Sequence, residues 1–135
     1  MLRGITTVTF FADDMEAATS WYTKVFGAEP YFNRQNAYIE WRVGDYQHEF
    51  GLLSSKFAPH TPGKGAVVYW AVDDVEAEYR RLLDLGAEPH DQPTERGPGF
   101  VTASVIDPFG NVLGVMFNEH YLQILEACGG SGSTA

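Results

Sequence analysis

The sequence has little cysteine, few basic residues and no long apolar run. Its one cysteine, Cys128, excludes an internal disulfide and a cysteine-based zinc site. Nine Lys and Arg against 18 Asp and Glu give a formal net charge of −9, which repels nucleic acid and anionic lipid. No apolar run approaches the length of a membrane span, and the first residues show no signal-peptide pattern. We therefore expect a cytoplasmic protein with neither nucleic-acid nor membrane partners.

Two short motifs occur twice in the chain. The segment DDMEA at 13–17 returns as DDVEA at 73–77, and GAEP at 27–30 returns at 86–89. A repeat of this length indicates a duplicated supersecondary unit. The chain of 135 residues is long enough for one domain with one substantial core.

The first copy of the repeat predicts a strand, a helix and three further strands, and the second copy is expected to repeat this order. β-branched and aromatic residues predict strands at 5–11, 31–34, 37–43, 47–54, 66–72, 100–106 and 112–117. The helices are predicted to begin after Asp13 or Asp14 and after Asp73 or Asp74, and to end near Gly27 and Gly86. The Pro- and Gly-rich stretch 92–99 is expected to be a loop, and 107–111 a hairpin turn. The fold class is α+β with mostly antiparallel pairing.

Four motifs, taken in order, carry a family resemblance. They are Ile5–Thr9 before Asp14, Trp21-Tyr22 before Phe26-Gly27, Val72–Asp74 before Leu85–Ala87, and Asp107–Asn111. The set resembles the vicinal oxygen chelate superfamily, which includes glyoxalase I, bleomycin-resistance proteins and extradiol dioxygenases. The resemblance implies the glyoxalase/bleomycin-resistance/dioxygenase fold, in which two tandem βαβββ modules form a cleft with their curved sheets. It also implies a homodimer, because homodimers are common in this superfamily.

The motifs set the expected boundaries along the chain. We expect a single domain at 1–128, with module one at 4–56, a linker at 57–65, module two at 66–118 and a C-terminal extension at 119–128. The Gly- and Ser-rich residues 129–135 are predicted to be a flexible tail.

The resemblance also implies where a metal would be bound. Metal-using members place a ligand His in the first strand of each module and a carboxylate near the end of each module. Thr7, Gly51, Val67 and Gly114 stand at these positions here. None offers the imidazole or carboxylate that a divalent metal prefers. We therefore expect no metal and no other cofactor.

Strand alternation predicts which side chains line the cleft. If those four positions face it, so do Thr9, Glu49, Leu53, Tyr69, Val112 and Met116. The more apolar opposite set then faces the helices: Val8, Phe10, Phe50, Leu52, Val68, Trp70, Leu113, Val115 and Phe117. The two glycines either leave space for a ligand or relieve a sheet bend or a dimer contact, and both interpretations stay open.

Glu49 is the sharpest candidate for chemistry in the cleft. Burial would raise its pKa and make it a general acid or base, whereas an exposed glutamate at a strand edge would do neither. Tyr38 and Trp41 either stack on a planar ligand or pack internally. The histidines are expected at the surface: His48 in a strand, and His60, His90 and His120 in loops or the tail.

These residues lead to one leading function and two alternatives. The leading hypothesis is a metal-independent small-molecule-binding protein of the glyoxalase/bleomycin-resistance type, which sequesters an apolar, aromatic or cationic compound. The first alternative is an enzyme of the same superfamily, a lyase, isomerase or dioxygenase-like protein, using Glu49 as acid or base or an atypically bound metal. The second is a non-catalytic interaction module whose cleft is filled by its dimer partner.

Overall fold

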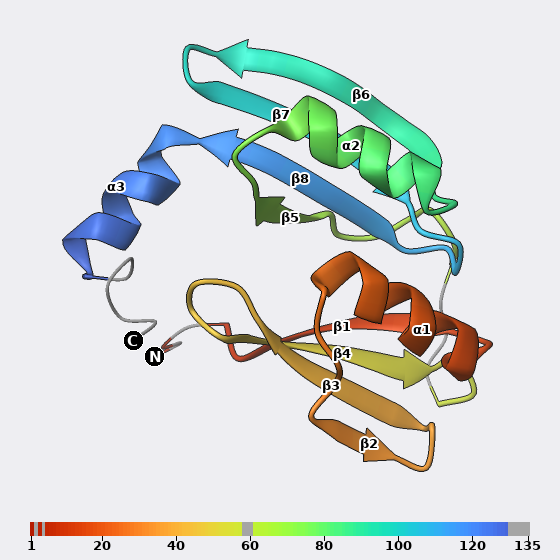
Figure 1. Cartoon of the computed structure of the whole chain (residues 1–135). Coiled ribbons are helices and arrows are strands. Elements are labelled where there is room, and N and C mark those ends of the chain that lie inside the picture. The colour runs from red at the N-terminus through yellow and green to blue at the C-terminus, as the bar shows by residue number, and fades with distance from the viewer. Residues whose placement is uncertain (2, 4, 58–60, 130–135) are drawn as a thin grey trace. The chain divides into compact units, whose positions relative to one another are not determined.

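The computed structural model describes residues 1, 3, 5–57 and 61–129, and the chain forms two compact units, Met1–His60 and Thr61–Ala135 (Figure 1). Each unit contains a four-stranded mixed sheet with a helix packed on one face. The predicted α+β fold class, with the same arrangement of strands and a helix in each half of the chain, is thereby confirmed.

Unit 1 has the predicted order of one strand, one helix and three strands. Its elements are β1 (Thr7–Ala12), α1 (Met15–Phe26), β2 (Phe32–Arg34), β3 (Tyr38–Val43) and β4 (His48–Ser54). The sheet order is β1-β4-β3-β2, with β1 and β4 parallel and the other pairs antiparallel. Of the two predicted caps, Asp14 is the one that starts α1, because its side chain accepts a hydrogen bond from the Ala17 amide at 3.0 Å.

Aromatic side chains fill the core between α1 and its sheet. Tyr22 and Trp41 are completely buried, and the rings of Tyr22 and Phe50 lie 5.0 Å apart between centroids. The indole nitrogen of Trp41 donates a hydrogen bond to the Ala28 carbonyl at 3.0 Å. Trp41 therefore takes the packing role of the two considered for it.

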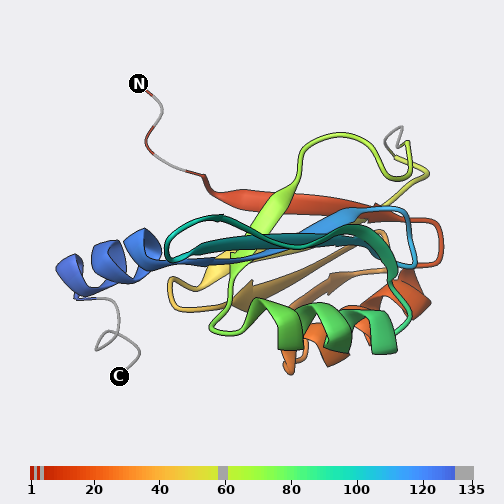
Figure 2. The same ribbon diagram turned by 90° about the horizontal axis from the view of Figure 1, so that it is seen from above.

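Unit 2 repeats this order and adds a helix at its end. Its elements are β5 (Val68–Ala71), α2 (Val75–Asp84), β6 (Glu88–Gly97), β7 (Phe100–Ile106), β8 (Val112–Asn118) and α3 (Glu119–Ala127). The sheet order is β5-β8-β7-β6, and α2 lies along one face of this sheet (Figure 2). Asp74 caps α2 by accepting a hydrogen bond from the Ala77 amide at 3.0 Å.

The hairpin turn predicted at 107–111 joins β7 to β8. Asp107, only 2% exposed, accepts hydrogen bonds from the Phe109 amide at 2.9 Å and the Asn111 amide at 2.8 Å. Its second oxygen accepts from the Asn111 side-chain amide at 2.8 Å. Gly110 has φ of 94°, a conformation that favours glycine. The turn is thus specified by residues adjacent in sequence, which is why the sequence could predict it.

The prediction of a loop at 92–99 is wrong for most of this range, because strand β6 continues through Gly97. β6 is an edge strand, and its register with β7 shifts between Pro89 and Asp91 and again between Asp91 and Thr94. Proline has no amide hydrogen to donate. Edge strands and bulges tolerate it because some of their residues form no hydrogen bond to a neighbouring strand. His90, expected in a loop, consequently lies in a strand.

The C-terminal extension also differs from expectation. His120, expected in a loop or the tail, lies in α3, which Asn118 caps by accepting a hydrogen bond from the His120 amide at 2.9 Å. His60, part of the expected linker at 57–65 and nearly all of the expected tail at 129–135 lie outside the described residues. The helices of the described chain have 12, 10 and 9 residues, too few to cross a bilayer.

Candidate functional site

Each sheet packs one face on the first helix of its unit, and we call the opposite face the open face of that unit. Phe10 and Phe50 of the predicted helix-facing set pack against α1, because their ring centroids lie 6.2 and 5.0 Å from that of Tyr22, and Leu52, Leu113 and Val115 of the same set are buried. The predicted cleft residues alternate with them and so lie on the open faces. Unit 1 and unit 2 each have such a face.

Strand pairing in unit 1 brings together five of the residues predicted for the site. Thr7 lies opposite Glu49, Thr9 opposite Gly51, and Phe11 opposite Leu53. The neighbouring strand β3 adds three polar side chains to the same face, since Tyr38 lies opposite Leu53, Glu40 opposite Gly51 and Arg42 opposite Glu49. The open face of unit 1 is therefore more strongly charged than the sequence suggested.

Both carboxylate oxygens of Glu49 have partners. The Thr7 hydroxyl donates a hydrogen bond to Oε1 at 3.0 Å, and Arg42 Nη2 forms an ion pair with Oε2 at 3.2 Å. The Arg42 guanidinium also lies over the Tyr31 ring, with its central carbon 5.0 Å from the ring centroid. Glu49 is thus paired with a positive charge of the protein itself, the guanidinium of Arg42.

A second carboxylate, Glu40, accepts hydrogen bonds from two tyrosines. The Tyr38 hydroxyl donates to Oε1 at 2.5 Å, and the Tyr31 hydroxyl donates to Oε2. Burial raises the pKa of Glu40, the neighbouring Glu49 raises it further, and Arg42 opposes both. Burial also raises the pKa of the Tyr38 phenol, with Glu49 adding to the effect and a hydrogen bond with Thr9 opposing it. A carboxylate held by two phenols is suited to binding a cation or accepting a proton.

Two tyrosine rings explain the paired glycines. A Cβ atom placed on Gly51 would lie 2.3 Å from the Tyr38 hydroxyl oxygen and 2.6 Å from two of its ring carbons. In unit 2, a Cβ atom on Gly114 would lie 2.5 Å from Cδ1 of Tyr69. Each glycine therefore leaves room for a phenol ring of its own unit, a reason that neither sequence-based interpretation contained.

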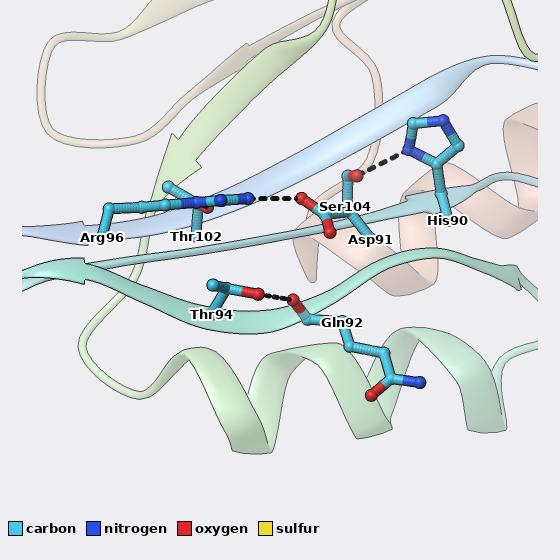
Figure 3. Close-up of polar contacts among 7 residues, drawn as sticks. All are labelled: His90, Asp91, Gln92, Thr94, Arg96, Thr102 and Ser104. Atoms are coloured by element: carbon cyan, nitrogen blue, oxygen red, sulfur yellow. Dashed lines mark hydrogen bonds and ion pairs between the residues drawn. The ribbon is translucent and has the colours of Figure 1, made fainter.

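The open face of unit 2 is polar at its β6 edge, as Figure 3 shows. A hydrogen bond of 2.7 Å joins His90 Nδ1 to Ser104 Oγ. Arg96 donates from Nε to the Thr102 hydroxyl at 3.1 Å and from Nη2 to Asp91 at 2.8 Å. Ser104 and Thr102 are 2% and 5% exposed, so two buried hydroxyls of β7 orient two longer side chains of β6.

The same strand also carries polar groups that belong to the other face. Gln92 points toward α2, and the Thr94 hydroxyl donates to the Gln92 carbonyl of its own strand at 2.8 Å (Figure 3). On the open face, Ser104 lies opposite Gly114, which in turn lies beside Tyr69. The row across this sheet therefore runs from a phenol ring through a glycine to a serine–histidine pair.

The remaining predicted residues are less closely connected. Val67 lies one residue before β5 and is exposed, while Met116 is half-buried opposite Thr102. Sequence reasoning missed eight side chains of the two polar networks, which are Tyr31, Glu40, Arg42, His90, Asp91, Arg96, Thr102 and Ser104. A signal existed in β3, where the polar series Tyr38-Glu40-Arg42 alternates with the apolar series Ile39-Trp41-Val43.

The four positions that the family resemblance assigns to a metal do not fit one. The Thr7 hydroxyl donates a hydrogen bond to Glu49, and Val67 is apolar. Tyrosine rings occupy the space that a side chain at position 51 or 114 would need. Across the residues that the structure describes, no group of three or more His, Cys, Asp or Glu side chains is placed to hold a metal ion.

Comparison with known proteins places the chain among glyoxalase-like folds. The family model of the Glyoxalase/Bleomycin resistance protein/Dioxygenase superfamily matches residues 4–115. A glyoxalase-related enzyme from Fulvimarina pelagi superposes with a TM-score of 0.73 at 20% identity, covering 87% of this chain and 90% of that one. A lactoylglutathione lyase from Agrobacterium tumefaciens gives 0.69 at 20% identity, covering 90% and 98%. No curated protein matches the sequence significantly.

Proposed function

The chain belongs to the Glyoxalase/Bleomycin resistance protein/Dioxygenase superfamily, and from this premise we propose that it is a metal-independent protein that sequesters a small organic molecule. The observation that carries the proposal is the seating of Tyr38 on Gly51 and of Tyr69 on Gly114. At both positions that would supply a metal-binding carboxylate, the space is given to an aromatic ring. The proposed ligand is apolar, aromatic or cationic, and it binds on the open face of a unit.

The tyrosines support binding of a flat molecule. Tyr38 is held against Gly51 by its hydrogen bond to Glu40, so little side-chain entropy is lost when a ligand stacks on it. Tyr69 is 40% exposed and so presents ring surface directly. The proposed binding residues are those predicted from the sequence: Thr7, Thr9, Gly51, Leu53, Val67, Tyr69, Gly114 and Met116. Tyr38 and Glu40 join them on structural grounds.

The test uses benzamide, a flat and uncharged probe, with chelator-treated protein. Benzamide has nine heavy atoms, so at about 0.3 kcal/mol per atom its Kd should be about 10 mM or tighter. NMR titration should shift resonances of Thr9, Tyr38 and Gly51. Replacing Tyr38 by Leu should abolish these shifts, whereas Tyr46→Leu, at an exposed tyrosine of the β3–β4 hairpin, should retain them.

A metal titration tests the other half of the proposal. Calorimetry with Zn²⁺ on the chelator-treated protein should detect no stoichiometric site of micromolar or tighter affinity. A 1:1 site whose removal abolishes ligand binding would refute metal independence, and benzamide shifts confined to the helix-facing side would refute the binding face.

We further propose that the protein is a cytoplasmic homodimer and that residues 1–128 act as one domain. The support is the superfamily, in which homodimers are common. Sedimentation equilibrium should give twice the 15.0 kDa chain mass, and a monomer at micromolar concentration would contradict the proposal.

A proton-transferring enzyme is the second candidate. Glu49 was the acid or base expected from the sequence, but Glu40 suits the role better, because its pKa is raised and two phenols hold it, whereas Glu49 is paired with Arg42. If the protein abstracts protons, it should speed deuterium uptake from D2O into the methyl group of acetophenone. Glu40→Gln should remove that acceleration and Glu49→Gln should preserve most of it. If the unsubstituted protein does not speed deuterium uptake, sequestration is left as the function.

A further inference from the structure

We propose that the ligand of the open face of unit 1 carries a planar cation, and that Arg42 occupies the place of this cation in the ligand-free protein. The inference rests on the proposed binding function and narrows it to one ligand class, an aromatic amidine or guanidine. It concerns the network formed by Tyr31, Glu40, Arg42 and Glu49.

The contacts of Arg42 are those that such a ligand would make. Its guanidinium lies over the ring of Tyr31 at 5.0 Å and forms an ion pair with Glu49 at 3.2 Å. A planar cation between an aromatic ring and a carboxylate forms a cation–π contact with the ring and a charge-assisted hydrogen bond with the carboxylate. The side chain of Arg42 therefore resembles a ligand attached to the protein by its own backbone.

The charges of this face favour a cation over an anion. Glu40 and Glu49 lie on neighbouring strands, and the charge of Glu49 adds to the effect of burial in raising the pKa of Glu40. Arg42 forms an ion pair with Glu49 of this pair. The other arginine of the sheet, Arg34 in β2, forms no ion pair with any residue that the structure describes. An incoming anion would meet two carboxylates, whereas an incoming cation would replace Arg42 without leaving Glu49 unpaired.

Arg42 is held weakly enough to be displaced. Its side chain is 50% exposed, and exposed ion pairs contribute little because water and salt screen them. Tyr31 is also half-exposed, so the stacking contact is accessible from solvent. The ligand must displace Arg42 before it binds. This requirement should weaken its binding by only about threefold to tenfold, compared with a protein that lacks the Arg42 side chain.

The experiment compares benzamidine with benzamide. The two probes have nearly the same shape and differ in charge, so their difference in affinity isolates the cation. By NMR titration, benzamidine should bind at least about fivefold more tightly. It should also shift the Arg42 Nε–H signal, which benzamide should leave in place.

Variants then separate displacement from general electrostatics. Arg42→Ala should tighten benzamidine binding by about threefold to tenfold while changing benzamide binding by less than about twofold. Arg34→Ala removes the same charge from the same sheet and should change benzamidine binding by less than about twofold. Glu49→Gln should weaken benzamidine binding to the level of benzamide.

The outcomes distinguish this inference from the function on which it rests. Equal binding of both probes on this face would overturn the cation and leave small-molecule binding intact. Tightening by Arg34→Ala as large as that by Arg42→Ala would overturn displacement in favour of net charge. Absence of binding by either probe would overturn both proposals, and looser benzamidine binding in Arg42→Ala would make Arg42 a supporting residue instead of a competitor.

Discussion

Adding one methyl group to Gly51 tests whether the glycine is needed for the Tyr38 ring. In Gly51→Ala the new Cβ atom would lie 2.3 Å from the Tyr38 hydroxyl oxygen, whereas ordinary contacts begin at about 3.5 Å. The end of the ring must therefore move by about 1 Å. A shift of that size disrupts the 2.5 Å hydrogen bond to Glu40.

The expected cost follows from these two effects. Overpacking and the weakened bond to a charged group together cost about 2–3 kcal/mol, because Tyr38 is a side chain that can partly move aside. Alanine is better than glycine inside a strand by about 0.5–1 kcal/mol, which offsets part of the loss. The net result should be a decrease of about 1–2 kcal/mol in the free energy of unfolding.

Urea unfolding followed by tryptophan fluorescence suits the measurement, since Trp21 and Trp41 are buried in unit 1. The matched control is Gly97→Ala, where a Cβ atom meets nothing within 4 Å and φ is not positive. That variant should be neutral or more stable by up to about 1 kcal/mol. In a Tyr38→Ala background, the cost of Gly51→Ala should disappear.

A Gly51→Ala protein as stable as Gly97→Ala would show that the Tyr38 ring does not require the glycine. A cost that persists after Tyr38 is truncated would show that the backbone, and not the ring, requires it. A double-mutant cycle gives the coupling directly, and it should be at least about 1 kcal/mol.

Three further predictions concern stability and titration. Burial raises the pKa of Tyr38, so the unfolded chain loses this proton first, and the free energy of unfolding falls as the pH rises above about 10. Titration followed at 295 nm should show one tyrosine that ionises at higher pH than the others, and Tyr38→Phe should remove it. Asp107→Ala deletes the acceptor of three hydrogen bonds in a buried turn and should cost about 2–4 kcal/mol by urea unfolding, whereas a cost below 1 kcal/mol would mean that water replaces the carboxylate. Gln35 has φ of 52° in the β2–β3 turn, so Gln35→Gly should stabilise unit 1 by about 0.5–1 kcal/mol, and a loss of stability would show that its side chain matters.

The parts of the fold that the sequence predicted are those encoded locally. Asp14 and Asp74 cap helices through residues three positions away, and Asp107 organises its turn through residues two and four positions away. Strand β6 escaped prediction because Pro89 and Pro93 normally argue against a strand. Its place at the sheet edge, which allows them, is a property of the assembled sheet.

The site was predictable in its faces but not in its contacts. Alternation, starting from the positions that the family resemblance implies for the cleft, assigned Thr7, Thr9 and Glu49 to one side of the sheet. The meeting of Tyr38 with Gly51 and of Arg42 with Glu49 depends on the register between β3 and β4. A shift of one residue would separate both pairs, and nothing within either strand sets that register by itself.

The two-sided sheet of each unit separates the requirements of folding from those of recognition. Glu40 lies opposite Gly51 in unit 1, and Ser104 lies opposite Gly114 at the corresponding place in unit 2. After duplication, selection could turn one copy acidic and equip the other with a hydroxyl and an imidazole, while both kept the same apolar face against a helix. The fold is therefore evolvable one face at a time, and a designer seeking a new ligand can vary the half-buried and exposed alternate positions of β3 without rebuilding the core against α1.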